Sequence, residues 1–500
     1  MTKMHGLDNL LELKGRISMA SPSKDAWHLT NILDSNKGGS FYWSLTIMAT
    51  IGGFLFGYDL SNIGSALNFV PYHLGSFALG YLVAGSSLGA AIGALAAGPI
   101  TDAWGRKSLL IMDSAIYAVG ALLSAFTVNA FMLLASRTLI GLAIGADSAI
   151  ATVYIAEYAP KARRGSLAIF QQWMITVGIF VAYIVGIVVF SLFPHQATTI
   201  DWRLILGLGA IPGFIGLIYR VHMPESPRWL LEHNQLARLQ KVLGLLGIEA
   251  SLDDLRRTRN HQRDKADRNS RHVTPGMRYA LLVAGVFMVF QQITGINIPL
   301  SYGPKILKPY FTSGHVTLVH AAVSGIEATL VLATVNMAAT YIGFRLIDNW
   351  GRRRISRVGY GGMAIFMIIA ALVLLYLGGL ARVITLLIAL AGFIVFFAFG
   401  VGGTGWIIQG EYFPTAQRGR MAAVVAFADW IANFVIVEAF PVLQKGLGLA
   451  AVMLVFALLS ILAVVFISRW MPETKGLSVE EIVARFERIT ENGGHPQNDP

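Results

Sequence analysis

The chain has 500 residues, of which 55% are hydrophobic and 13% are charged, and its mean hydropathy is +0.60. Soluble domains are about 45–50% apolar and about 25% charged, so this composition excludes an ordinary water-soluble protein. The chain contains no cysteine, which excludes disulfides and thiolate metal sites. We expect the net charge of +11 to reflect membrane topology rather than a nucleic-acid partner.

The first 41 residues are polar and mixed in charge, and they contain no short apolar core followed by a small-residue cleavage site. This pattern is not that of a secretory signal peptide. We therefore expect residues 1–41 to form a cytoplasmic tail.

Apolar stretches of about 20 residues, the length that crosses a hydrocarbon core of about 30 Å, recur along the rest of the chain. They predict an all-α membrane protein with twelve transmembrane helices. The predicted spans are 42–66, 75–100, 108–127, 130–156, 165–192, 202–222, 278–305, 318–347, 356–378, 383–409, 420–443 and 447–469.

Basic residues are divided unequally between the two sides of the predicted bundle. All of them except the intramembrane Arg137 and five others fall on one side in this topology. Because cytoplasmic loops carry an excess of Lys and Arg, that side is predicted to be cytoplasmic, and an even number of spans places both termini there. The five on the opposite side are Arg203, Lys305, Lys308, Arg382 and Lys445.

A polar segment separates spans six and seven. Its residues 228–247 have helical periodicity with an apolar stripe, which predicts short amphipathic helices on the cytoplasmic face. A flexible linker is the alternative. The predicted organisation is an N-terminal bundle at 42–222, a linker at 223–277, a C-terminal bundle at 278–470 and a cytoplasmic tail at 471–500.

Three short motifs each occur twice, about 250 residues apart, which is the signature of an internal repeat. The sequence DAWGRK at 102–107 recurs as DNWGRR at 348–353. EYAPKARRG at 157–165 recurs as EYFPTAQRG at 411–419, and PESP at 224–227 recurs as PETK at 472–475. These repeats predict two six-helix halves of parallel design, an arrangement found in a large class of transporters.

Further motifs give the repeated halves a family resemblance. They are GGFLFGYD at 52–59, RTLIGLAIG at 137–145, YIAEYAPKARRG at 154–165, PESPRWL at 224–230, QQITGIN at 291–297 and PETKGLSVEEI at 472–482. With the two DxWGR loops, the chain resembles the sugar porter family of the major facilitator superfamily over nearly its whole length. The resemblance implies transport by alternating access, most closely that of a proton-coupled sugar or polyol symporter of the cell membrane.

The repeated loops predict ion-pair clusters that tie helix ends together on the cytoplasmic side, because carboxylates and guanidinium groups there form charge-assisted hydrogen bonds. In the family such clusters are understood as a cytoplasmic gate. Plain positive-inside topology is the alternative interpretation. The residues concerned are Asp102, Arg106, Glu157, Arg164, Asp348, Arg352, Glu411 and Arg418.

Asp59 and Arg137 lie well inside apolar helices, where an unpaired charge costs several kcal/mol. We therefore expect the two to pair, with the glycines that follow Arg137 allowing the two helices to approach closely. The resemblance implies that Asp59 takes up the coupled proton, since an Asp at this place does so in proton-coupled sugar porters. A purely structural ion pair is the alternative.

A cavity for a polyol needs neutral groups that both donate and accept hydrogen bonds. By their distance from family motifs, five amides match sugar-contacting places, and Trp406 matches a ring-stacking tryptophan. Because Asn297 precedes Pro299, helix seven is predicted to break there, which would make Tyr302 part of an outer gate. The five amides are Gln172, Gln291, Gln292, Asn297 and Asn336.

Some positions depart from a typical hexose carrier. Asp147 lies ten residues after Arg137, a spacing found in phosphate and organic-anion carriers of the same superfamily, and helix eleven reads Ala-Asp-Trp with Asp429. The rival hypothesis is therefore an organic acid, phosphate or another small metabolite bound near Asp147 and Asp429. Glu327 and Glu438 are further candidate acids, although either would also suit an aqueous vestibule.

Other classes of function fit the sequence less well. No nucleotide loop, metal-ligand cluster or nucleophile triad is present, so we expect neither an enzyme nor a cofactor or metal. A facilitative uniporter and a non-transporting nutrient sensor remain as alternatives, although sensors usually carry long cytoplasmic extensions. The partners that we expect are a small-molecule substrate, protons and the lipid bilayer, and we expect the protein to be a monomer.

Overall fold

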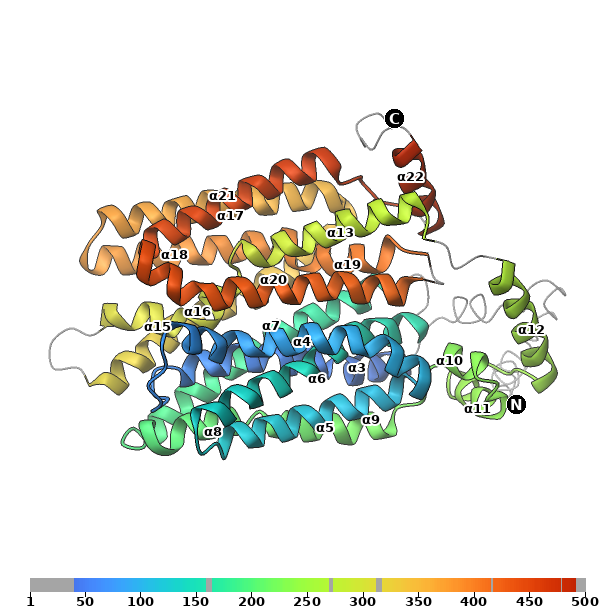
Figure 1. Cartoon of the computed structure of the whole chain (residues 1–500), viewed down its shortest axis with the longest axis horizontal. Coiled ribbons are helices and arrows are strands. Elements are labelled where there is room, and N and C mark those ends of the chain that lie inside the picture. The colour runs from blue at the N-terminus through green and yellow to red at the C-terminus, as the bar shows by residue number, and fades with distance from the viewer. Residues whose placement is uncertain are drawn as a thin grey trace, which may run out of the picture.

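The computed structural model describes residues 40–158, 164–268, 273–311, 317–414, 417–477 and 479–491. Every regular element in these ranges is helical (Figure 1). Almost all of the predicted tail 1–41 lies outside the described residues.

The first half of the fold comprises the helices that precede the polar linker. They are α3 (Ser40–Ala66), α4 (Ser76–Trp104), α5 (Arg106–Ala125), α6 (Ala130–Tyr158), α7 (Arg164–Leu192), the π-helical turn η2 (Ala197–Asp201), α8 (Trp202–Gly207) and α9 (Ala210–His222). The linker then forms α10 (Pro227–Glu232), α11 (Leu236–Leu245) and α12 (Leu252–Arg268). Amphipathic linker helices were predicted, and the structure confirms them.

The second half comprises the helices from α13 to α21, followed by the terminal helix α22. They are α13 (Pro275–Ile293), α14 (Asn297–Ser301), α15 (Gly303–Leu307), the 3-10 turn η3 (Lys308–Phe311), α16 (Leu318–Trp350), α17 (Arg352–Tyr376), α18 (Gly379–Phe397), the π-helical turn η4 (Ala398–Gly402), α19 (Gly403–Glu411), α20 (Arg418–Leu447), α21 (Leu449–Trp470) and α22 (Val479–Glu491).

Eleven helical segments among the described residues are long and apolar enough to cross a membrane. The remaining predicted span corresponds to α3, which has 27 residues and carries Asp59 and Asn62 among its apolar side chains. These polar groups lower its mean hydropathy, but α3 lies among the other spans in the bundle (Figure 1). The twelve-helix prediction therefore agrees with the structure.

The two halves lie side by side in Figure 1, with α3 to α9 in blue to green and α13 to α21 in yellow-green to red. Across their boundary α4 packs along α20, and α7 packs along α16. We call the side where α10, α11, α12 and α22 lie the linker side of the bundle, and the other the opposite side (Figure 1).

The terminal helix α22 docks on the second half at the linker side. Its apolar residues Ile482, Phe486 and Ile489 are buried, and the ring of Phe486 packs against Tyr412 at 4.8 Å between centroids. Glu487 accepts a hydrogen bond from the backbone N–H of Gly276 at 3.0 Å, which satisfies a donor in the first turn of α13. Part of the predicted tail is thus an ordered amphipathic helix.

Glycines in α6 allow close packing, but their partner differs from the predicted one. A Cβ added at Gly141 would overlap the backbone of Ser86, and one at Gly145 would overlap that of Ala90, both in α4. The expectation that this series faces the helix of Asp59 was therefore wrong. Sequence spacing shows that small residues share a face, but it does not identify the helix that the face contacts.

The predicted break in helix seven is present and lies slightly earlier than expected. Helix α13 ends at Ile293, and α14 begins at Asn297. Gly295 between them has φ +87°, a conformation that side chains with a Cβ rarely adopt. The glycine therefore turns the chain, and Asn297 opens the next helix instead of closing the previous one.

Candidate functional site

Asp59 of α3 and Arg137 of α6 form a buried ion pair in the first half. The Arg137 Nη1 donates to Asp59 Oδ1, its Nη2 donates to Oδ2 at 2.8 Å, and its Nε donates to the Leu82 carbonyl at 3.2 Å. The side chains are 0% and 2% exposed. The structure thus brings together the two charges that the sequence pairs, in the bidentate geometry that makes such pairs strong.

A cavity of about 50 Å³ lies between the two halves. A cavity of this size has room for only a few water molecules. The predicted amides and both aromatic and aliphatic side chains contribute to its wall. The lining residues are Phe56, Leu60, Gln172, Ile175, Thr176, Ile179, Gln291, Gln292, Ile296, Asn297, Leu300, Asn336, Phe397, Trp406 and Asp429.

All five predicted amides and Trp406 therefore line one cavity. Gln172 of the first half accepts a hydrogen bond from Trp406 Nε1 of the second half at 2.9 Å. Gln291 Nε2 donates to the Gly402 carbonyl at 3.1 Å, while its buried Oε1 has no hydrogen-bond partner among the described residues. A buried acceptor without a donor is a place where a hydroxyl group of a ligand gains a hydrogen bond.

A chain of amide hydrogen bonds crosses the cavity wall. Gln292 Nε2 donates to Asp429 Oδ1 at 2.8 Å, and Gln292 Oε1 accepts from Asn297 Nδ2 at 3.0 Å. Asn297 also donates to Asn433 at 2.9 Å, and Asn433 donates to Ser87 of the first half at 2.9 Å. This network couples the cavity to the boundary between the halves.

The two additional candidate acids lie in different environments. Asp429 lines the cavity, whereas Asp147 is not among its lining residues and pairs with Arg220 instead. Among the described residues that line the cavity, Asp429 is the one charged side chain, and no basic side chain is present. An anionic substrate would therefore meet a carboxylate without a compensating cation.

Arg220 is a buried arginine that the topology prediction placed at the cytoplasmic end of its span. Its side chain is 0% exposed and contacts Asp113 and Asp147. Arg137 is therefore not the sole arginine buried within the predicted spans. A basic residue in the last turn of a helix is compatible with a position at the membrane surface or inside the bundle, so the sequence alone did not show that Arg220 is buried.

Tyr302 makes its hydrogen bond and its ring contact within the second half. Its hydroxyl donates to the Val437 carbonyl at 3.1 Å, and its ring packs against Phe440, both in α20. Contact across the halves at this level comes from Tyr183 of α7, whose hydroxyl donates to the Leu300 carbonyl of α14. The role of Tyr302 in an outer gate stays a prediction.

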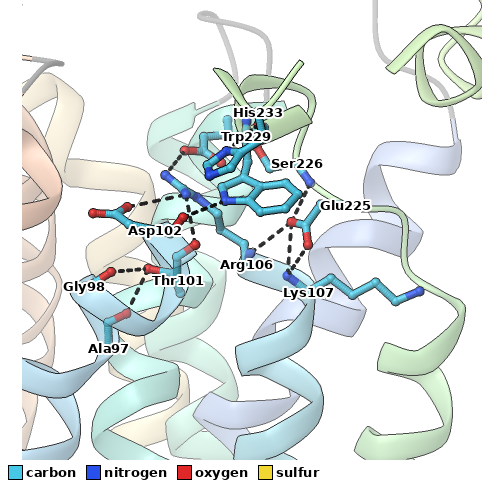
Figure 2. Close-up of polar contacts among 11 residues, drawn as sticks. Ala97, Gly98, Thr101, Asp102, Arg106, Lys107, Glu225, Ser226, Trp229 and His233 are labelled. Carbon is cyan, nitrogen blue, oxygen red and sulfur yellow. Dashed lines mark hydrogen bonds and ion pairs between the residues drawn. The ribbon is translucent and has the colours of Figure 1, made fainter. Parts of the chain in front are cut away.

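Arg106 is the centre of an ion-pair cluster on the linker side of the first half (Figure 2). Its Nη2 donates to Glu157 Oε1 at 3.1 Å, and its Nη1 lies 3.6 Å from Asp102 Oδ1. Glu157 is 8% exposed and Asp102 is 79% exposed. The contact with Glu157 is therefore the stronger tie, because exposed pairs contribute little.

Glu225, from the first PES motif, caps the start of α5 beside this cluster (Figure 2). It accepts hydrogen bonds from the backbone N–H of Arg106 at 2.9 Å and of Lys107 at 3.2 Å. Gly105 before them has φ +94°, and a Cβ there would overlap the carboxylate. A negative charge at a helix N-terminus is stabilising, so the motif joins the linker to α5.

The second half repeats this arrangement. Arg352 Nη2 donates to Glu411 Oε1 at 2.8 Å, and Glu473 accepts from the backbone N–H of Arg352 at 2.8 Å and of Arg353 at 3.1 Å. Arg418 Nε donates to the Phe413 carbonyl at 3.3 Å. The side chains of the two other predicted gate residues, Arg164 and Asp348, lie outside the described residues.

The two capping glutamates were not among the predicted site residues, although the sequence contained a signal for them. Glu225 and Glu473 occupy equivalent places in the repeated PES and PET motifs. Asn433 follows Asp429 by one helical turn, so it lies on the same face of α20. Both patterns were readable before the structure, although neither identifies the hydrogen-bond partners.

Replacing either capping glutamate by alanine is expected to lower the thermal midpoint of the purified protein. Glu225→Ala and Glu473→Ala each leave two backbone N–H groups at a helix start without their charged acceptor, and such hydrogen bonds contribute about 1.5–3 kcal/mol. Glu225→Gln keeps an acceptor and should lose less. Alanine at the exposed Glu249 is the control, and an unchanged midpoint in both capping variants would contradict the role.

Comparison with known proteins places this chain in a family. The family model described as "Sugar (and other) transporter" matches residues 45–486. The glucose transporter GlcP of Staphylococcus epidermidis is 32% identical over 87% of this chain and 95% of its own length. The arabinose-proton symporter of Bacillus subtilis is 30% identical over 88% of this chain and 93% of its own length.

A solved structure has the same architecture. The proton:xylose symporter XylE bound to 6-bromo-6-deoxy-D-glucose matches with a TM-score of 0.74 and 25% identity, over 90% of this chain and 99% of that chain. The family match covers both halves, the cavity between them and both linker-side clusters. The chain therefore belongs to the sugar porter family of the major facilitator superfamily and is a multi-pass membrane transporter.

Proposed function

We propose that this protein is a proton-coupled symporter that carries a monosaccharide or a related polyol across the cell membrane by alternating access. The observation that carries the proposal is a cavity walled by amide side chains beside a buried Asp–Arg pair. Phe56 and Leu60 of α3 line the cavity, and Asp59 is the residue before Leu60. The similarity to a glucose transporter, an arabinose-proton symporter and a proton:xylose symporter supports the same function.

The substrate class follows from the chemistry of the cavity wall. Amides both donate to and accept from hydroxyl groups, and Trp406 offers an apolar face for a sugar ring. Gln172, Gln291, Gln292, Asn297 and Asn336 are the proposed substrate ligands. The absence of a basic side chain from the described lining disfavours the organic-acid and phosphate alternative, since Asp429 would repel an anion.

Proton coupling is assigned to Asp59. When ionised, its carboxylate accepts the bidentate hydrogen bonds of Arg137, and protonation removes the charge that holds the guanidinium. Released Arg137 would then be free to bias the bundle between two orientations. Widening of the small cavity to admit a sugar would accompany that change.

The orientation in the membrane completes the proposal. The linker side is cytoplasmic, as are both termini, and the protein acts as a monomer. The moving units are 42–222 and 278–470, joined by 223–277, with tails at 1–41 and 471–500. The clusters around Arg106 and Arg352 would form the cytoplasmic gate together with Arg164, Asp348 and Arg418.

Uptake by liposomes that contain the purified protein tests the proposal. We expect a neutral sugar or polyol, from a panel of D-xylose, L-arabinose, D-glucose and myo-inositol, to accumulate above equilibrium when the lumen is alkaline. A protonophore should abolish the accumulation, because it dissipates the proton gradient. Phosphate and succinate serve as the anionic arm of the panel.

The possible outcomes separate the alternatives. Transport of an anion without transport of any neutral solute would overturn the substrate class. Equilibration of a sugar without accumulation would identify a uniporter and overturn proton coupling. Sugar binding without any transport would indicate a nutrient sensor.

A further inference from the structure

A second buried cluster of charges lies in the first half, away from the cavity. Arg220 of α9 donates through Nη1 to Asp113 of α5 and through Nη2 to Asp147 of α6. The three side chains are 0%, 2% and 5% exposed. We call Asp113, Arg220 and Asp147 the buried triad.

The remaining donors of Arg220 are already used within the bundle. Nη1 also donates to the Leu110 carbonyl at 3.0 Å and to Ser114 Oγ at 3.0 Å. Nη2 also donates to the Ala49 carbonyl of α3 at 3.3 Å. The guanidinium is therefore held in place by three helices, and both aspartates are fixed on it.

The triad contains two carboxyl groups and one cation. If both aspartates were ionised, it would carry one net negative charge in a region shielded from water. An uncompensated charge in such a place costs several kcal/mol, and two interacting carboxyl groups avoid it by sharing a proton. Both carboxyl groups contact the same guanidinium, which holds them close to each other.

Asp113 has an oxygen that needs a partner. Its Oδ2 is buried and receives no hydrogen bond from any described residue. A bound proton would satisfy this atom by turning it into a hydroxyl donor. Asp147 is the most exposed member of the triad, since 5% of its side chain is accessible to solvent. Gly52 of α3 packs directly against its carboxylate.

Among the described residues, Arg220 is the one cation that pairs with the two aspartates. The other titratable side chains within seven residues of a triad member or of Gly52, along the four surrounding helices, are Tyr58, Asp59, Arg106, Lys107, Tyr117, Tyr154, Tyr219 and His222.

We propose that the buried triad is a second proton-binding site, in which Asp113 and Asp147 share one exchangeable proton over Arg220. It lies on the linker side of the Asp59–Arg137 pair, since Gly52, which contacts Asp147, precedes Asp59 by seven residues of α3, or about 10 Å. Asp113 is likewise about 10 Å into α5 from its linker-side start at Arg106. The site therefore stands between Asp59 and the linker side.

The position of the buried triad suggests that it relays protons between Asp59 and the linker side. A proton released from Asp59 toward the linker side would pass to the triad before reaching water. This role rests on the proposed proton coupling, whereas proton binding by the triad does not. The two claims are therefore tested by different measurements.

Proton binding is tested by infrared difference spectra of the purified full-length protein in lipid nanodiscs, recorded between acidic and alkaline buffer. We expect the wild type to show a protonated carboxyl signal that is lost in Asp113→Asn and equally lost in Asp147→Asn. Each variant leaves Arg220 one carboxylate partner, so the remaining pair is neutral without a proton. Asp59→Asn is the matched control, and the triad signal should persist in it.

Stability provides a second measurement. Because the single variants retain a balanced ion pair, their thermal midpoints in alkaline buffer should not fall below that of the wild type. A carboxyl signal that survives in both variants would overturn the proposal, as would a large loss of stability in both, which indicates that both aspartates are ionised. Should one variant not fold, the other tests the same shared proton.

Transport then tests the role of the site. Both Asp→Asn variants of the triad should slow proton-driven accumulation of the sugar that the wild type accumulates, and leave sugar exchange without a proton gradient unchanged. Unaltered accumulation would overturn the relay role. Wild-type protein without any proton-driven accumulation would instead refute the proposed function, and the infrared result would stand independently.

Discussion

Asp59→Asn is expected to abolish accumulation of the substrate against its gradient while sparing exchange of substrate across the membrane. Asparagine cannot take up a proton, so the coupled step is lost. The variant also leaves Arg137 buried without its carboxylate, and breaking a buried ion pair typically costs about 3–5 kcal/mol. The measurement is liposome uptake with an alkaline lumen, together with counterflow of labelled substrate.

The control for this experiment is Asp59→Glu, which keeps an ionisable carboxyl group near Arg137. We expect it to retain part of the accumulation, because the longer side chain still binds a proton. The thermal midpoint of each variant shows whether a loss of transport merely reflects unfolding. Accumulation that survives in Asp59→Asn would refute the assigned role of Asp59.

Gln292→Ala is expected to weaken binding of the sugar about tenfold or more. Gln292 lies at the centre of the amide network, where it donates to Asp429 and accepts from Asn297. Its truncation removes groups that bind hydroxyls and leaves the buried carboxylate of Asp429 without the hydrogen bond from Gln292, a penalty of about 1–3 kcal/mol. Since about 1.4 kcal/mol corresponds to tenfold in affinity, titration calorimetry with the transported sugar resolves the change.

Gln409→Ala is the matched control for Gln292→Ala. Gln409 is also a buried amide of the second half and donates to the Ala422 carbonyl at 2.8 Å, but it does not line the cavity. Its replacement should lower the thermal midpoint and leave sugar affinity unchanged. Equal affinity of the wild type and Gln292→Ala would argue for a substrate that does not use the amide network.

Much of the fold was predictable from the sequence because a bilayer imposes simple requirements on a chain. A span needs about 20 apolar residues, and each predicted stretch contains one helix or a short series of helices. The repeated motifs at 102–107 and 348–353 predicted equivalent places in two halves, and both form the start of a helix capped by a glutamate. The observed helix bounds differ from the predicted span bounds by several residues, since helices extend beyond the hydrocarbon core.

Site residues were predictable where a side chain could be buried with only one kind of partner. Asp59 and Arg137 are opposite charges in apolar helices, so each required the other as a partner. The five amides matched motifs of the family, and they do line one cavity. From the sequence, Asp429 was only a candidate acid of the rival hypothesis, and the structure shows that it lines the cavity.

Other parts of the site could not be predicted because they depend on how each helix is rotated about its axis. The glycines of α6 face α4 and not α3, which leaves Gly52 as the close contact between α3 and the carboxylate of Asp147. In the sequence, Arg220 looks like an ordinary basic residue at a helix end. In the structure, helix packing places it against Asp113 and Asp147.

By itself the sequence determined that this protein spans a membrane in two repeated halves, which charges must be paired, and which family it resembles. Only the tertiary structure decided that Asp147 joins Asp113 and Arg220 while Asp429 faces the cavity. Hydropathy and motifs report the average environment of a segment. The partner of a single buried charge depends instead on which helix faces it, and that is set by side-chain packing across the whole bundle.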